Sequence, residues 1–278
     1  MKLNLFFSTL INNKMARICL IGIGLLILIA AFAPVLAPND PTEVVLTARL
    51  KGPSAEFPLG TDNMGRCLLS RLMYGTRISL SVAIVITILS LTIGTIVGMF
   101  SGYKGGWIDG WMMRLCDIFL AFPSLVLVLV IIGVLGPGIQ NIMIAMIAVH
   151  WLWYARVIRS NTLQLRNSDF VAAAKISGSS DMDIIILHIF PNLVPQILVL
   201  STLDLASVIM HLSGFSFLGL GIQPPTPEWG IMISDGRDFI RTMPQLMAYP
   251  GMAIFLTVIF FNYLGDCLRD IVEEMRVS

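Results

Sequence analysis

The sequence predicts an all-helical integral membrane protein with six transmembrane helices. Of its 278 residues, 56% are hydrophobic and only 13% are charged, whereas an average soluble domain has about 25% charged residues. The chain also contains six apolar stretches, and crossing a bilayer takes roughly 20 such residues. These observations exclude a soluble globular enzyme, a disordered chain and a collagen-like fibre. The 18 basic and 17 acidic residues nearly cancel, which argues against a nucleic-acid-binding protein.

The first predicted helix covers residues 18–36 and belongs to an N-terminal region, residues 1–77. This run is long for the apolar part of a signal peptide and further spans follow it, so we expect an uncleaved helix. Pro34 and Pro38 are expected to mark its end. The polar residues 37–77, which include several Pro and Gly residues, form the predicted extracytoplasmic loop.

The other five spans belong to a second region, residues 78–278. We expect these spans at residues 78–100, 118–135, 139–155, 193–217 and 246–264. Residues 136–138, Gly-Pro-Gly, predict a tight turn between two of them. A C-terminal tail follows the last span.

Basic residues set the expected orientation of the chain in the membrane. With the N-terminus inside, the inner segments hold eleven of the 18 Lys and Arg residues, among them Lys2 and Arg276, and the outer segments hold seven. The excess of positive charge inside predicts that both termini are cytoplasmic. Five of the seven outer basic residues lie in the loop at 37–77.

The largest inner segment, residues 156–192, is predicted to hold two short helices. They are expected at 169–177 and 181–190, with Gly178 allowing a sharp reversal between them and Pro191 ending the second. Two exposed helices on the cytoplasmic side can dock a soluble partner or lie on lipid, and composition alone leaves both interpretations open.

This inner segment resembles the "EAA" coupling loop of ABC-importer permeases. The residues that carry the resemblance are Ala173, Ala174, Gly178, His188 and Pro191. Ala172 stands where the family's name-giving glutamate usually occurs. The resemblance implies coupling helices that fit a groove on an ATPase subunit. We expect Ala173 and Ala174 to keep one helix face thin enough for close approach of that partner.

Other motifs resemble those of the peptide/nickel permease family, and in particular its second permease. They lie at residues 59–66, 102–109, 113–117 and 216–230. The resemblance implies the type I ABC importer permease fold and a location in the cytoplasmic (inner) membrane. The implied partners are a homologous second permease, two ATP-binding subunits, an extracytoplasmic substrate-binding protein and the lipid bilayer. The implied substrate is nickel or a metal–metallophore chelate, and di- or oligopeptides are the alternative.

The chain itself is not expected to be an enzyme. It contains no GxxxxGK[ST] phosphate loop, so ATP and Mg are expected on partner subunits and no cofactor is expected here. An ion-coupled secondary transporter is the competing class. Asp204 and His211 favour it slightly, but such transporters usually contain an inverted repeat, and none is evident in this sequence.

The fifth predicted span carries a polar stripe. Its members are Ser201, Asp204, Ser207 and His211, which recur at helical spacing. An aspartate at mid-membrane costs about 2.5–3.5 kcal/mol and usually faces a cavity or a partner. The stripe therefore lines a translocation path, or it forms hydrogen bonds between helices. No metal site is firmly assigned, and His150 and His188 are interpreted as structural residues.

Overall fold

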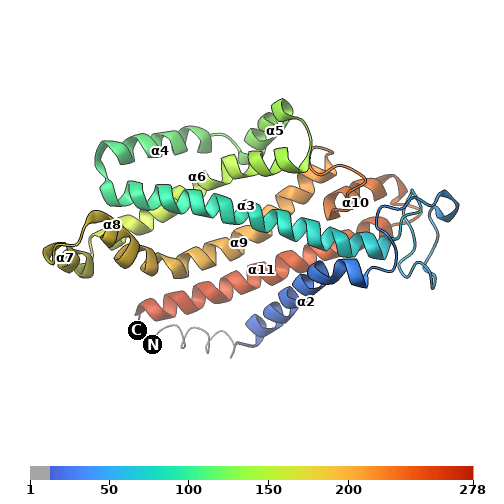
Figure 1. Cartoon of the computed structure of the whole chain (residues 1–278), viewed down its shortest axis with the longest axis horizontal. Coiled ribbons are helices and arrows are strands. Elements are labelled where there is room, and N and C mark those ends of the chain that lie inside the picture. Colours follow the sequence, from blue (N-terminus) through green and yellow to red (C-terminus); the bar gives the residue numbers. More distant parts are fainter. Residues whose placement is uncertain (1–12, 278) are drawn as a thin grey trace. The chain divides into compact units, whose positions relative to one another are not determined.

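The structure, a computed structural model, describes residues 13–277 and the side chains as far as Glu274. Lys2 and the side chain of Arg276, both counted above as inner basic residues, lie outside the described part. Within that part there is no strand, only an isolated β-bridge between Thr61 and Cys67. The helices (Figure 1) are α2 (Lys14–Leu36), α3 (Leu68–Lys104), α4 (Gly106–Leu120), α5 (Ser124–Leu135), α6 (Ile139–Arg166), α7 (Asp169–Ile176), α8 (Asp181–Asp183), α9 (Phe190–Phe217), α10 (Trp229–Gly236) and α11 (Gln245–Val277).

Five helices in the described part are long and apolar enough to cross a membrane, and a sixth span results if α4 and α5 count as one. This confirms the predicted all-helical membrane fold. The span predicted at residues 118–135 is not one continuous helix, because it takes in the end of α4 and the whole of α5, which meet at a bend of 84°. Pro123 precedes α5, and a proline cannot continue the preceding helix.

Several helices extend well past the apolar runs that predicted them. α3 begins ten residues before position 78, and α6 continues to Arg166. The first part of the predicted inner loop, residues 156–166, is therefore helical. Hydropathy misses these ends because a helix does not stop where its side chains become polar. The region boundary predicted between residues 77 and 78 falls inside α3 and stays a prediction.

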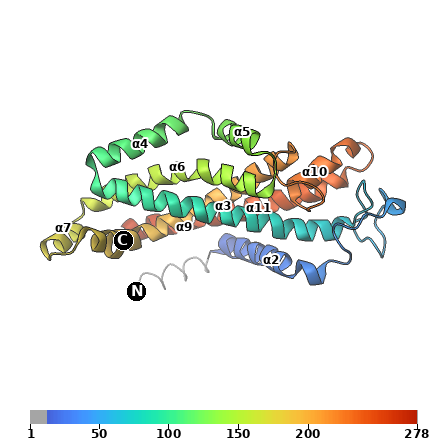
Figure 2. The same ribbon diagram turned by 45° about the horizontal axis from the view of Figure 1, so that its top comes forward.

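The chain folds as two compact units, and the first contains residues 13–85, 135–142 and 202–277 of the described part. In this unit α2 and α11 lie side by side (Figures 1 and 2). They approach so closely that a Cβ atom on Gly22 would lie 2.5 Å from the Phe260 ring. In the loop that follows α2, Ala48, Phe57 and Cys67 form a small buried core.

The second unit contains residues 86–134 and 143–201. Its part of α3 packs on α6 through Gly94, Gly98 and Gly102. A Cβ atom on Gly98 would lie only 2.5 Å from the carbonyl oxygen of Ala155, so the two backbones touch where small residues permit it. A shared core joins these helices to α7 and to the start of α9; it consists of Tyr103, Tyr154, Ile158, Val171, Ala174, Ile184, Ile185, Ile189, Leu193 and Leu200.

Candidate functional site: the coupling segment and two buried polar clusters

The coupling segment, which we define as residues 169–190, reverses direction at Gly178. Gly178 has φ +84°, a left-handed conformation that glycine adopts without strain. Ser180 then caps α8, since its hydroxyl accepts from the Asp183 amide at 3.2 Å and the Asp183 carboxylate accepts from the Ser180 amide at 3.3 Å. The predicted reversal between two short helices is confirmed.

Polar contacts fix the coupling segment to the end of α3. The Asp181 carboxylate pairs with Lys104 Nζ at 2.5 Å and accepts a hydrogen bond from the Tyr103 hydroxyl at 2.8 Å. Lys175 Nζ lies 5.4 Å from the centre of the Tyr103 ring, within the range of a cation–π contact. Both short helices are thus held to one end of α3.

Two predictions about this segment are wrong. Ala174 does not belong to an outer face, because it is buried in the shared core with Val171, three residues earlier on the same side of α7. Ala173 is exposed, as predicted for a partner-facing residue. Pro191 does not end a helix but lies in the first turn of α9. A π-helical turn at Ile184–Ile189 widens the helix just before Pro191 and gives room for its ring.

The exposed surface of the coupling segment includes several large apolar side chains. Ile176 is 88% exposed and Leu187 is 64% exposed. Met182 and Ile186 are exposed as well. Side chains of this kind gathered on one short segment mark a contact with a protein or a membrane. His188 is half-buried, and its carbonyl oxygen accepts a hydrogen bond from the side-chain Nδ2 of Asn192 at 2.7 Å.

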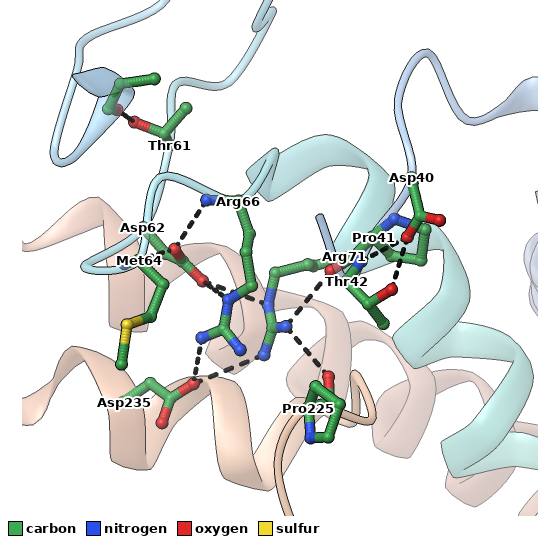
Figure 3. Close-up of polar contacts among 11 residues, drawn as sticks. Asp40, Pro41, Thr42, Thr61, Asp62, Met64, Arg66, Arg71, Pro225 and Asp235 are labelled. Carbon is green, nitrogen blue, oxygen red and sulfur yellow. Dashed lines mark hydrogen bonds and ion pairs between the residues drawn. The ribbon is translucent and has the colours of Figure 1, made fainter. Parts of the chain in front are cut away.

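A buried ionic cluster in the first unit explains the motif at residues 59–66 (Figure 3). Asp62 Oδ2 lies 2.6 Å from Arg66 Nε and 3.4 Å from Arg71 Nε. Both arginines also reach Asp235 of α10, at 2.9 and 3.4 Å. Arg71 is only 1% exposed, and it donates further hydrogen bonds to the carbonyl oxygens of Pro41 and Pro225. The cluster ties the loop after α2 to α3 and α10.

Local backbone bonds place Asp62 for this role. Asp62 Oδ1 accepts from the amides of Met64 and Arg66 at 2.8 and 2.9 Å. Gly65 within this turn has φ +77°, and a Cβ atom there would overlap the carbonyl group of Val45. The motif at residues 59–66 therefore has two structural roles: it forms this turn, and it provides charged groups of the ionic cluster.

Glu228 forms a second buried polar cluster in the first unit. Its carboxyl group accepts hydrogen bonds from the hydroxyls of Ser79 and Ser213 at 3.2 and 3.3 Å, and from the Ile231 amide at 3.0 Å. Glu228 thereby caps the start of α10. Its burial raises the pKa of the Glu228 carboxyl above the usual range. The cluster joins α3, α9 and α10 at a point where sequence reasoning expected no site residue.

Comparison with known proteins identifies the family. Residues 94–276 match the family described as "Binding-protein-dependent transport system inner membrane component". The chain belongs to this family. Residues 3–53 match the "N-terminal TM domain of oligopeptide transport permease C". The permease is 42% identical to the nickel transport system permease protein NikC of Escherichia coli K12, over 99% of both chains.

Two further relatives have other names. The permease is 43% identical to the dipeptide transport system permease protein DppC of Alkalihalophilus pseudofirmus, over 98% of this chain and 90% of the relative. It is 37% identical to the glutathione transport system permease protein GsiD of Pectobacterium atrosepticum, over 98% and 91%. The chain is therefore an inner-membrane, multi-pass permease subunit of a binding-protein-dependent ABC importer with the type I fold, as predicted.

The polar stripe of the fifth predicted span lies on α9 of the permease. Ser201, Asp204, Ser207 and His211 are all half-buried. The Ser207 hydroxyl lies 3.4 Å from His211 Nδ1, and the Ser201 hydroxyl donates to the carbonyl of Leu198 at 3.0 Å. Among the described residues, no three His, Cys, Asp or Glu side chains come together as a set of metal ligands.

Proposed function

We propose that this permease moves nickel or a metal–metallophore chelate across the cytoplasmic membrane. The observation that carries the proposal is the match to a nickel permease over 99% of both chains. A second feature supports it: residues 210–213, just before the motif at 216–230, contain no carboxylate, whereas peptide-type members commonly have a glutamate there. Because the chain belongs to a family of ABC-importer permeases, an ion-coupled secondary transporter is not needed to explain its membrane spans and polar residues.

The proposed complex contains a homologous second permease, two ATP-binding subunits and an extracytoplasmic substrate-binding protein. ATP and Mg bind to the ATP-binding subunits, and this chain holds no cofactor of its own. Closure of the two ATP-binding subunits moves the coupling segments, and the spans then alternate between inward- and outward-facing arrangements. The exposed apolar surface of Ile176, Met182, Ile186 and Leu187 supports docking of an ATP-binding subunit, together with Ala173 and His188.

The proposed orientation places both termini in the cytoplasm. It is supported by the excess of basic residues in the inner segments and by the position of the coupling segment, which has to face the ATP-binding subunits. In Ser179→Cys, made without the four native cysteines, a membrane-impermeant thiol reagent should react only from the cytoplasmic side. Reaction from outside intact cells would reverse the orientation.

Transport of di- or oligopeptides is the second candidate function. The 43% identity to a dipeptide permease favours it. The two candidates are separated by uptake of radioactive nickel and of a labelled dipeptide, in a strain that lacks this permease and in the same strain with it restored. Restored nickel uptake supports the first candidate, and restored dipeptide uptake alone replaces it with the second.

The polar stripe on α9 is proposed to line the translocation path. Asp204 and His211 are seven residues apart on one helix, about two turns, and so share a face. Weak contacts on such a path let a solute enter and leave. Asp204→Asn and His211→Ala should reduce uptake at unchanged yield of the complex. Loss of assembly would instead identify a hydrogen bond between helices.

A further inference from the structure

The exposed face of α4 divides along its length into two flanks. At 3.6 residues per turn, Gly110, Arg114 and Asp117 share one flank, and Trp111, Leu115 and Ile118 share the neighbouring one. All six residues are exposed. Among these six residues, the first flank is polar or small and the second is entirely apolar; Trp107, which is 75% exposed, lies at the border of the two flanks near the start of the helix. Residues of the two flanks alternate along the sequence, so both flanks cover the same length of helix. A difference in depth in the membrane therefore cannot explain why one flank is polar and the other is apolar.

The polar flank continues onto α6 within the same unit. The Asp117 carboxylate, 63% exposed, forms an ion pair with the Arg156 guanidinium, which is 48% exposed. Ser160 and Gln164, one and two turns further along α6, are also exposed. We call Gly110, Arg114, Asp117, Arg156, Ser160 and Gln164 the polar band.

The charge of the band is positive. Arg114 and Arg156 contribute two positive charges and Asp117 one negative charge. Asp117 is paired with Arg156. In the described part of the chain Arg114 has no carboxylate within ion-pair distance. Its guanidinium therefore offers free, planar donors of the kind that bind a carboxylate.

The packing of α6 on α3 places the band beside an uncharged stretch. Residues 78–103 of α3 contain no charged side chain. Gly98, within that stretch, lies against the backbone of Ala155, next to Arg156. Lys104, at the end of the stretch, is six residues further on, about 9 Å along the helix. Arg156 itself lies within α6, a helix that is long and apolar enough to span the membrane, and a charged side chain in such a helix is unfavourable in hydrocarbon and usually turns to a water-filled cavity.

We propose that the polar band lines a water-filled part of the substrate pathway, where Arg114 contacts the carboxylate of a passing solute. The apolar flank of α4 faces lipid. The proposal rests on the importer function proposed above and adds a substrate chemistry to it. A metal chelate with carboxylate ligands and a peptide with its terminal carboxylate both satisfy that chemistry.

The first test compares matched positions on α4 in membrane vesicles that contain the complete transporter. Gly110→Cys probes the polar flank, and a Cβ atom there meets nothing within 4 Å. Trp111→Cys probes the apolar flank one residue away. A water-soluble methanethiosulfonate reagent should modify the first thiol at least about ten-fold faster, because a thiol in apolar surroundings ionises less and reacts slowly. Ser160→Cys on α6 should behave like Gly110→Cys.

The second test measures the charge of the band directly. The thiol of Gly110→Cys is modified with anionic sulfonatoethyl methanethiosulfonate and, separately, with cationic trimethylammonium-ethyl methanethiosulfonate. The measured quantity is the ratio of the anionic to the cationic modification rate. Arg114 is about 6 Å from position 110 on the helix, where one charge in water changes each rate about three-fold. Adding Arg114→Gln should therefore lower the ratio of anionic to cationic rates by about ten-fold.

Three results would overturn the proposal. Equal rates on the two flanks would show that the polar band is not selectively wet. Protection of both flanks would show that a partner subunit or lipid covers the band. An unchanged rate ratio in Arg114→Gln would remove the carboxylate contact. These readouts need no substrate. A failure of the nickel and dipeptide uptake assays in the parent permease would therefore count against the proposed function and not against the wet polar band.

Discussion

Replacing Gly98 with alanine tests the contact between α3 and α6. The new methyl carbon would lie 2.5 Å from the carbonyl oxygen of Ala155 and 3.0 Å from the amide nitrogen of Arg159, whereas ordinary contacts begin at 3.4 Å. Both atoms belong to the backbone of α6, so no rotamer change relieves the overlap, and the helices must separate by nearly 1 Å. Overpacking costs about 1–3 kcal/mol and alanine returns about 1 kcal/mol of helix propensity, so we expect a net loss of about 1 kcal/mol.

The matched control is Gly133→Ala on α5, where a Cβ atom meets nothing within 4 Å. This variant should gain only the helix propensity, about 1 kcal/mol. The two variants should thus differ by about 2 kcal/mol, which corresponds to about 4–8 °C in the melting temperature of the purified complex. If Gly98→Ala melts with or above Gly133→Ala, the close backbone contact does not stabilise the permease.

Three further changes test the coupling segment and the two buried clusters. A Cβ atom on Gly178 would meet nothing within 4 Å, but Gly178→Val forces a β-branched residue to φ +84°, so uptake should fall while the permease still inserts. Normal uptake with normal stimulation of ATP hydrolysis would exclude a coupling role. In the parent, the raised pKa of the Glu228 carboxyl means that the folded state holds its proton more tightly. The stabilisation that protonated Glu228 gives the folded state is fully present at pH values below the pKa of this group in the unfolded chain, and it is lost as the pH rises through its pKa in the folded protein. The melting temperature of Glu228→Gln should therefore not show this decline with pH. Parallel profiles of melting temperature against pH in the parent and the variant would show that the raised pKa does not affect stability. Asp62→Asn leaves two buried arginines with too little negative charge and should cost about 3–5 kcal/mol, whereas exposed Asp40→Asn should leave the melting temperature almost unchanged.

The features predicted from the sequence are those encoded by local composition. Long apolar runs predicted the spans, and the glycine at position 178 predicted the reversal that its φ of +84° confirms. α4 was missed as a helix because its charged residues broke the apolar run. In the fold these charges are neutralised by residues far along the chain. Asp109, for example, pairs with Arg159 at 2.5 Å on both of its oxygens.

The same limit explains the sites that were missed or misplaced. The motif around Asp62 was recognised in the sequence. The arginines that pair with Asp62 also pair with Asp235, which lies on α10, a helix that no long apolar run predicts. Glu228 follows a loop rich in proline, and nothing in its neighbourhood shows that Ser79 and Ser213 will surround it. Ala174 was assigned to the outer face because spacing along α7 does not reveal which face meets the core.

The core shared by the coupling segment, α3, α6 and the start of α9 has a mechanical consequence. Val171, Ala174 and Ile184 interlock with Tyr154 and other buried side chains of that core, and close-packed interiors deform very little. A push on the two short helices therefore cannot be absorbed by bending within this unit. In the proposed complex, this unit should therefore move as one rigid body and pass the movement of an ATP-binding subunit on to its membrane-spanning helices.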